Sequence, residues 1–306
     1  MDDIKRVLVA VDLTEMDEKL VRYVAMLSNT INLDKVYFFN VMKSMELPES
    51  ISQKYPNLVA PIDEATKKEI QYTIDEEAGN QLKAEYEIDV MEGSRVEKIL
   101  KWAKIKEVDL IVLGRKSTLK GDGIVSAKIV RLAPCSVALI PEEVPEKLDK
   151  AIVSIDFSKS SKIVFGFALH LATTQPKASI TCLNVYSVPS GYSISGKSFE
   201  EFAGIMKKNS MDSMEELLSH FDTKDIAIDT KFELDEDDNV AKIIYKVAME
   251  EKASAIITGS QGRTQAASFI LSSVAEKLLK QDSKIPMIVV KQRKHNLNFL
   301  EALLRI

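Results

Sequence analysis

The chain has 306 residues, a length that favours two domains, each large enough to bury its own core. Lysine and arginine number 41 against 46 for aspartate and glutamate, and the resulting net charge of −5 argues against general binding to nucleic acid. With 45% hydrophobic and 28% charged residues, the composition excludes disordered, collagen-like and disulfide-scaffold proteins.

The early part of the chain carries no long apolar segment. The longest run there, residues 7–11, ends at Asp12 and is too short for a signal peptide or a membrane span. We therefore expect a cytoplasmic protein that does not bind membranes.

The cysteines and histidines lack the spacing of a metal or redox site. Cys135 and Cys182 are far apart, form no CxxC pair and have no histidine nearby. His170, His220 and His295 are also isolated from one another. The sequence therefore predicts two buried thiols and no metal centre.

The sequence contains an internal repeat. Residues 7–14 (VLVAVDLT) return as 151–158 (AIVSIDFS), and residues 39–41 return as 183–185, both 144 positions later. Two landmarks at one spacing indicate a duplicated domain.

Each copy alternates short apolar runs with segments of helical spacing. Runs that are apolar throughout are typical of parallel strands buried on both faces, so we predict two doubly wound α/β domains, each with a five-stranded parallel sheet. The predicted strands lie near residues 5–11, 35–41, 84–90, 108–113 and 136–140, and near 150–155, 179–185, 226–232, 254–258 and 287–290. Helices are predicted between them, for example over 97–107 and 240–250.

The predicted organisation is a first domain over residues 1–143, a second over 148–291 and a C-terminal helical tail over 292–306. A linker rich in proline and charge, residues 141–150, joins the domains. The tail has a wide apolar helical surface, which we expect to pack on its own domain.

Small residues follow the fourth strand of the second copy. Gly259 and Gly262 come first, and Ser272 and Ser273 then open a predicted helix. Ligands bind beyond the carboxyl ends of parallel strands, and glycines with a helix N-terminus present backbone N–H groups to an anion. This pattern suits a phosphate site, and a plain strand-to-helix turn that binds no ligand uses the same residue types.

The same residues resemble the signature of the universal stress proteins, which reads Gly, two residues, Gly, nine residues, Gly, and then Ser or Thr. The chain departs at one position, where Ser272 replaces the third glycine. The resemblance spans both tandem copies and implies the adenine nucleotide alpha hydrolase-like fold. It implies ATP, ADP or AMP as ligand, with magnesium as an accompanying ion. The implied contacts are Ile155, Asp156 and Val185 for adenine, and Gly259, Gly262, Ser272 and Ser273 for the phosphates.

The first copy departs further from this signature. Ser117 replaces the second glycine, the loop is four residues shorter, and Gly123 is followed by Ile124. Fewer donors converge there, so we expect a degraded nucleotide motif in a domain kept for pairing.

A second motif competes with this interpretation. Gly191–Ser198 fits the phosphate-loop pattern Gly, four residues, Gly-Lys-Ser, which would make the protein an NTP hydrolase. Residues 187–190 separate the motif from the preceding apolar run, whereas a phosphate loop leaves its strand directly. We expect Lys197 to be solvated or, at most, accessory to the nucleotide.

The predicted function is therefore regulatory adenine-nucleotide binding by the second domain, in a stress response. The resemblance implies that the two domains pair through their last strands, and it leaves open a homodimer and a further protein partner. A nucleotide-free interaction scaffold and the phosphate-loop hydrolase are the alternatives. Since no general base, activated nucleophile or carboxylate pair is recognisable, any ATP hydrolysis should be slow.

Overall fold

The computed structural model describes residues 4–43, 60–115, 122–175, 177–223, 226–262, 271–281 and 284–292. The chain divides into two compact units. One, here the first domain, comprises residues 2–144 together with 291–306, and the other, the second domain, comprises residues 145–290. The predicted tail lies almost entirely outside the described residues.

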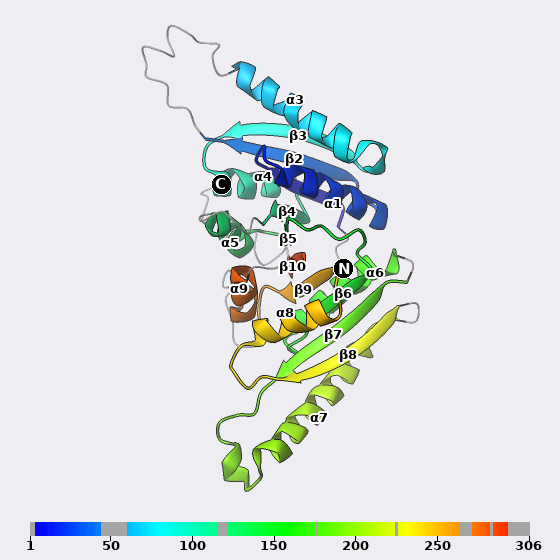
Figure 1. Ribbon diagram of the computed structural model, residues 1–306, viewed down its shortest axis with the longest axis vertical. Helices are drawn as coiled ribbons and strands as arrows, with labels where there is room; N and C mark the ends of the chain where they lie inside the picture. The colour runs from blue at the N-terminus through cyan, green and yellow to red at the C-terminus, as the bar shows by residue number, and fades with distance from the viewer. Residues whose placement is uncertain are drawn as a thin grey trace. The chain divides into compact units, whose positions relative to one another are not determined.

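The first domain has a parallel sheet with the strand order β3-β2-β1-β4-β5 (Figure 1). Four of its strands are almost wholly buried, which explains their continuous apolar runs, while β3 at one edge is partly exposed and carries charges. The strands are β1 (Arg6–Val11), β2 (Lys35–Met42), β3 (Glu85–Glu92), β4 (Leu110–Gly114) and β5 (Ser136–Ile140).

Helices of the first domain pack in two pairs, α1 with α3 and α4 with α5. The chain adds β2 and β3 on one side of β1 and then, after β3, adds β4 and β5 on the other side, so right-handed crossovers place the two pairs on opposite faces of the sheet. Their bounds are α1 (Met16–Thr30), α3 (Ala60–Glu77), η1 (Gly79–Gln81), α4 (Arg95–Ile105) and α5 (Asp122–Leu132).

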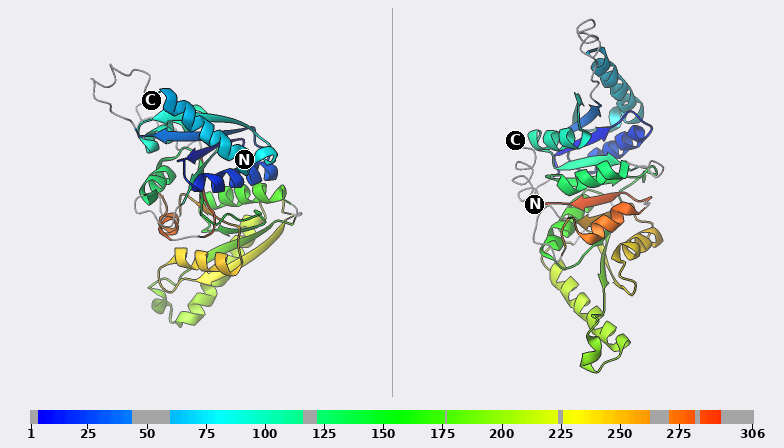
Figure 2. Two further views of the ribbon diagram at one scale, coloured as in Figure 1. Left: turned by 45° about the horizontal axis from the view of Figure 1, so that its top comes forward. Right: turned by 90° about the vertical axis from the view of Figure 1, so that its left-hand side faces the viewer.

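The second domain repeats this architecture with the strand order β10-β9-β6-β7-β8 (Figure 1). Figure 2 shows the same domain, coloured from green to orange-red, in two further views. Its strands are β6 (Lys150–Ser154), β7 (Ser179–Tyr186), β8 (Ala227–Leu234), β9 (Ala255–Gly259) and β10 (Met287–Val290). Its helices are α6 (Lys159–Thr173), η2 (Tyr192–Ser195), α7 (Phe199–Leu218), α8 (Val240–Glu250) and α9 (Ser273–Lys280).

The predicted α/β class and all the predicted strands are confirmed, with strand ends displaced by at most two residues. The helix predicted over 240–250 has those bounds, and the helix predicted over 97–107 begins and ends two residues earlier.

Unusual backbone conformations also recur at the repeat spacing. Leu13 and Phe157, each one residue after the first-strand aspartate, both have φ +59°. Glu107 and Lys252, before the fourth strands, have φ +51° and +53°. Residues other than glycine rarely adopt this left-handed backbone conformation. Its presence at equivalent positions shows that both domains keep the same strained turns.

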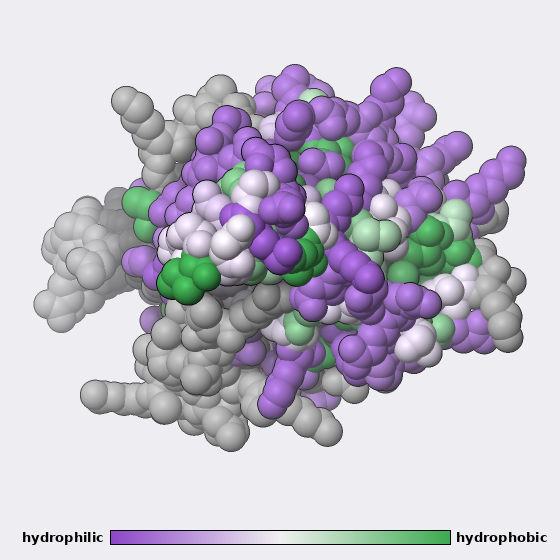
Figure 3. Space-filling model, turned by 90° about the horizontal axis from the view of Figure 1, so that it is seen from below, coloured by the Kyte–Doolittle hydropathy of each residue, from purple (hydrophilic) through white to green (hydrophobic). Residues whose placement is uncertain are grey.

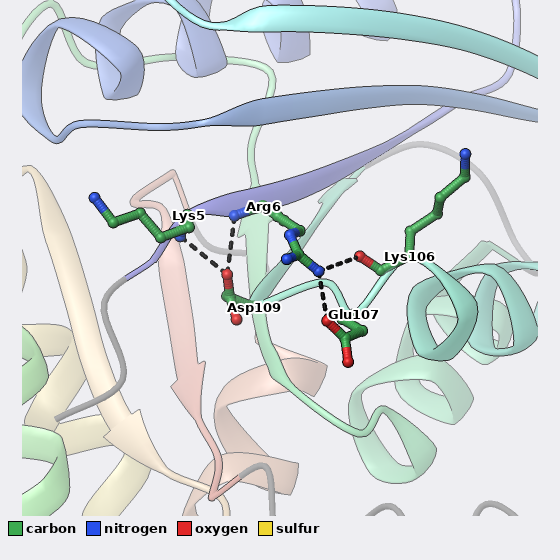
Figure 4. A network of polar contacts seen from close by, with 5 residues as sticks. All are labelled: Lys5, Arg6, Lys106, Glu107 and Asp109. Atoms are coloured by element: carbon green, nitrogen blue, oxygen red, sulfur yellow. Dashed lines mark hydrogen bonds and ion pairs between the residues drawn. The ribbon is translucent and has the colours of Figure 1, made fainter.

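The start of β1 is held by a polar network (Figure 4). One carboxylate oxygen of Asp109 accepts hydrogen bonds from the backbone N–H groups of Lys5 and Arg6, both at 2.9 Å. The Arg6 guanidinium donates to Glu107 at 2.7 Å and to the carbonyl of Lys106 at 3.2 Å. These contacts join β1 to the turn that precedes β4, at the opposite end of the strands from the site described below.

The surface drawn in Figure 3 is mostly hydrophilic, with small, separate hydrophobic areas. Ile194 in η2 is the most exposed of the large hydrophobic side chains that the structure describes, at 92%. Among the helices within the described ranges, none has the length and apolarity needed to cross a bilayer.

Candidate functional site

A cavity of about 160 Å³ opens beyond the carboxyl ends of β6, β7 and β9 and is here called the second-domain cavity. All seven residues singled out in the sequence line it, although they come from four separate segments of the chain. They are Ile155, Asp156, Val185, Gly259, Gly262, Ser272 and Ser273.

The turn after β6 fixes the carboxylate of Asp156. The buried Asn184 side chain donates to the carbonyl of Ile155 at 2.8 Å, where the chain leaves the sheet. One oxygen of Asp156 then accepts from the Ser158 N–H at 3.0 Å and from the Ser161 hydroxyl at 2.8 Å. The left-handed Phe157 lies inside this turn, and the aspartate is therefore held in one orientation.

The two glycines allow a close approach between loops. A Cβ atom at Gly262 would lie 3.3 Å from the second carboxylate oxygen of Asp156. One at Gly259 would lie 3.2 Å from both the carbonyl oxygen of Gln261 and a methyl group of Val164. Space, rather than a left-handed backbone, explains why glycine occupies both positions.

The N-terminus of α9 forms another wall. The Ser272 hydroxyl caps the helix by accepting from the Ala275 N–H at 3.1 Å, and it lies 3.4 Å from the Gly259 carbonyl, to which it donates. Ser273, the first residue of the helix, is exposed at the cavity. The unpaired N–H groups and dipole of a helix N-terminus favour an anion there.

Most of the polar side chains that line the second-domain cavity carry a hydroxyl group. Six lining side chains carry a hydroxyl, one carries a carboxylate, and none of the described lining residues is a lysine or arginine. A bound anion would therefore be held by N–H and O–H donors rather than by a cationic side chain.

Sequence reasoning missed several lining residues. Ser160 and Ser161 lie in the first turn of α6. The Ser160 hydroxyl donates to the Gln261 carbonyl at 2.8 Å, which joins this turn to the loop after β9. Val240, at the start of α8, also lines the cavity. The cluster of four serines over 154–161 was the available signal.

The equivalent place in the first domain is built differently. A Cβ atom at Gly114 would clash with Cγ of Met16, so the methionine fills the space beside this glycine. Asp17, at the position of Ser161, accepts from the N–H groups of Asp12 and Leu13 at 3.0 and 2.8 Å. A buried carboxylate thus replaces a hydroxyl. Ser117 lies outside the described residues, and Ile124 is exposed on α5.

The Gly191–Ser198 motif forms a helix cap. The Ser198 hydroxyl accepts from the Glu201 N–H at 3.1 Å, and the Glu201 carboxylate accepts from the Ser198 N–H at 2.8 Å. This capping box uses the donors that a phosphate loop presents to its nucleotide. Lys197 is exposed and does not line the second-domain cavity.

The cysteines are buried and not disulfide-bonded, and burial raises the pKa of the Cys182 thiol to about 12. No group of three or more His, Cys, Asp or Glu side chains within the described ranges is arranged to hold a metal ion.

Comparison with known proteins gives one family. The sequence model of the universal stress protein family matches residues 3–141 and again residues 147–291. No protein with a curated description matches the chain significantly.

Solved structures share the two-domain fold. A universal stress protein from Archaeoglobus fulgidus DSM 4304 is 19% identical, with 94% of this chain and 96% of that chain covered and a TM-score of 0.63. A protein of unknown function from Pseudomonas aeruginosa PAO1 is 14% identical, with 99% and 97% covered and a TM-score of 0.63. At these identities the likeness concerns the fold.

Proposed function

Because the chain belongs to the universal stress protein family and carries the family fold twice, we propose that its second domain binds an adenine nucleotide. ATP or the related ADP or AMP would be the ligand, in a regulatory, stress-response role in the cytoplasm. The observation that supports this most strongly is the meeting of all seven predicted residues around one hydroxyl-rich cavity.

The nucleotide would lie with its phosphates toward β9 and α9. Gly259 and Gly262 leave room for the phosphates to approach the backbone, and the N-terminus of α9 supplies a favourable dipole. Adenine and ribose would lie toward Ile155, Asp156 and Val185, where apolar walls meet one fixed carboxylate.

The first domain would not bind a nucleotide in this way. Met16 occupies the space beside Gly114, and the buried carboxylate of Asp17 would repel phosphate. We therefore expect one nucleotide per chain.

Magnesium would accompany the nucleotide rather than occupy a protein site. Mg²⁺ is commonly bound through substrate phosphates and one or two carboxylates, and Asp156 is the one carboxylate among the described residues that line the cavity. Among the described residues that line the cavity, none besides Asp156 carries a group that could activate water, and we expect any hydrolysis to be slow and incidental.

Calorimetric titration of the full chain with ATP, ADP and AMP tests the proposal. The expected stoichiometry is near one, and Gly262→Val should reduce affinity at least tenfold because its side chain blocks the approach to the backbone. Gly204→Val is the matched control, since a Cβ atom at Gly204 in α7 meets nothing within 4 Å. Mass spectrometry of small molecules released from purified protein would identify the ligand.

The phosphate-loop alternative makes the opposite prediction for Lys197. As an exposed residue outside the cavity, Lys197→Ala should change nucleotide affinity less than about fivefold, or roughly 1 kcal/mol. Loss of binding and of magnesium-dependent turnover in Lys197→Ala, with Gly259→Val tolerated, would contradict the proposed site and favour a hydrolase.

A further inference from the structure

The first domain contains a smaller cavity of about 70 Å³, here called the first-domain cavity. Its walls are almost entirely aliphatic or aromatic. They comprise Ala10, Val11, Met16, Leu20, Phe39, Val41, Ile99, Leu113, Val125 and Ile129. Such a lining excludes a polyphosphate and favours an apolar group.

The repeat shows which polar groups the first domain lacks. Met16 stands where the second domain has Ser160, and Leu113 stands where it has Thr258. Of the six hydroxyl groups around the second-domain cavity, the described lining here offers one, on Ser126. The two cavities therefore differ in the chemistry of the ligand they can accept.

Two opposite charges also line the first-domain cavity. Asp12 follows β1, and its carboxylate accepts a hydrogen bond from the Thr14 hydroxyl at 2.6 Å. Arg95, where the second domain has Val240, forms no hydrogen bond or ion pair with any residue in the described ranges. The guanidinium and carboxylate are therefore not paired with each other.

Arg95 is the first residue of α4, where a positive side chain opposes the helix dipole. The preceding Ser94 makes no side-chain capping bond. A ligand carboxylate there would bind the guanidinium and also interact favourably with the helix N-terminus.

We propose that the first-domain cavity binds a small aliphatic α-amino acid. Its side chain enters the apolar interior, its carboxylate binds Arg95 and its ammonium group binds Asp12. A cavity of about 150 Å³ accommodates benzene, so the smaller volume here suits a side chain of a few carbons, such as that of valine. This inference does not rest on nucleotide binding by the second domain.

Equilibrium dialysis of labelled glycine, alanine and valine against the full chain tests the proposal. Affinity should rise about fourfold for each carbon buried from glycine to valine. Isovalerate and isobutylamine, which are valine without its ammonium and without its carboxylate, should each bind at least fivefold more weakly than valine.

The tryptophan at position 102 locates the binding. It is the chain's one tryptophan and stacks on Phe39, a wall of the cavity, with ring centroids 5.4 Å apart. Valine should change its fluorescence over the concentration range measured by dialysis.

Variants separate recognition from folding. Arg95→Gln changes an exposed residue and should weaken valine binding at least fivefold, whereas Lys98→Gln, on the same helix but outside the lining, should leave it unchanged. Met16→Ala should shift the preference from valine toward leucine by enlarging the cavity.

Three results would overturn the inference: no retention of valine at millimolar concentration, isovalerate binding as tightly as valine, or displacement of valine by ATP. Valine binding that persists in Gly262→Val would show that this site is independent of the proposed nucleotide site. The two proposals can therefore fail separately.

Discussion

Asparagine occupies the same position in the second strand of each domain, and its role is visible at the level of one hydrogen bond. The Asn40 amide donates to the Val11 carbonyl at 3.0 Å, and the Asn184 amide donates to the Ile155 carbonyl at 2.8 Å. Both side chains are buried. Each amide thus holds the carbonyl of the residue directly before the aspartate, at the point where the chain leaves the sheet.

Asn184→Ala should therefore lower both stability and nucleotide affinity. Loss of the amide leaves a buried carbonyl unpaired, at a cost of about 1–3 kcal/mol, and frees the turn that orients Asp156. Chemical denaturation and calorimetric titration measure the two effects. Asn40→Ala is the control, with a similar loss of stability and unchanged nucleotide affinity. Equal losses of affinity in both variants would show that the effect is not local.

Lys291 is a buried lysine in the first domain. Its ammonium group donates to the carbonyls of Arg131 and Ala133 at 2.9 and 3.0 Å, beside the end of α5. Burial lowers the pKa of this group to about 8, a shift that the nearby Cys135 partly opposes. The folded protein thus holds this proton less tightly than the unfolded chain.

The stability contributed by Lys291 should increase with pH. Between pH 8 and about 10.5 the unfolded chain binds more protons at this site, so the folded state gains about 1.4 kcal/mol per pH unit across that window. Denaturation of the wild type and of Lys291→Met at several pH values isolates this contribution from other titrating groups. A difference between the two proteins that is constant or falls from pH 8 to 10 would contradict it.

At the scale of single elements, short polar networks decide where strands and helices begin. The capping box of α7 explains why a serine and a glutamate three residues apart follow Lys197. The Asp109 network does the same for β1, since two backbone N–H groups at the strand's start depend on one carboxylate oxygen (Figure 4).

Asp109→Ala should destabilise the first domain by about 1–3 kcal/mol, because two partly buried N–H groups lose their acceptor. Denaturant unfolding followed by Trp102 fluorescence reports on this domain. Nucleotide affinity of the second domain should not change. Asp109→Ser tests the hydrogen bond, since the second domain uses Ser254 to accept from the Lys150 N–H at 3.0 Å, and it should retain more stability than alanine.

Across the whole molecule, the two domains share the same arrangement of strands and helices but differ in the side chains at equivalent positions. Lys106 pairs with Glu87 on β3 at 3.0 Å, and at the same positions of the second domain Glu251 pairs with Lys231 on β8. The ion pair has kept its place with its charges reversed. The cavities have diverged further, because Met16 and Asp17 replace a pair of serines.

Exchanging Met16 and Ser160 between the domains should affect nucleotide binding in the second domain but not in the first. Ser160→Met should abolish nucleotide binding, since the new side chain would fill the space beside Gly259 as Met16 fills that beside Gly114. Met16→Ser should not create a second site, because the Asp17 carboxylate remains. Titration of both variants gives the stoichiometry, and a value near two for Met16→Ser would contradict this account.

The amino-acid pattern was sufficient for the class of fold, the duplication and the strands. Runs such as 7–11 and 287–290 are apolar throughout because both sheet faces are covered, and this local signal needs no knowledge of partners. Gly259, Gly262, Ser272 and Ser273 were found for a related reason. They come after an apolar strand, and the carboxyl ends of parallel strands share one edge of the sheet. Ile155, Asp156 and Val185 were implied by the resemblance to the universal stress proteins.

Other features depend on which distant segments meet. Ser160 lines the cavity because α6 brings it against the Gln261 carbonyl, and Met16 closes the space beside Gly114 only because α1 packs over the end of β4. The Gly191–Ser198 motif is the clearest case. Its residue pattern fits both a phosphate loop and a helix cap, and the hydrogen bonds between Ser198 and Glu201 identify it as a cap. Composition and spacing report local conformational preferences. Which acceptor a given N–H group binds, and which side chain fills a given space, depends on segments that meet only in the folded chain.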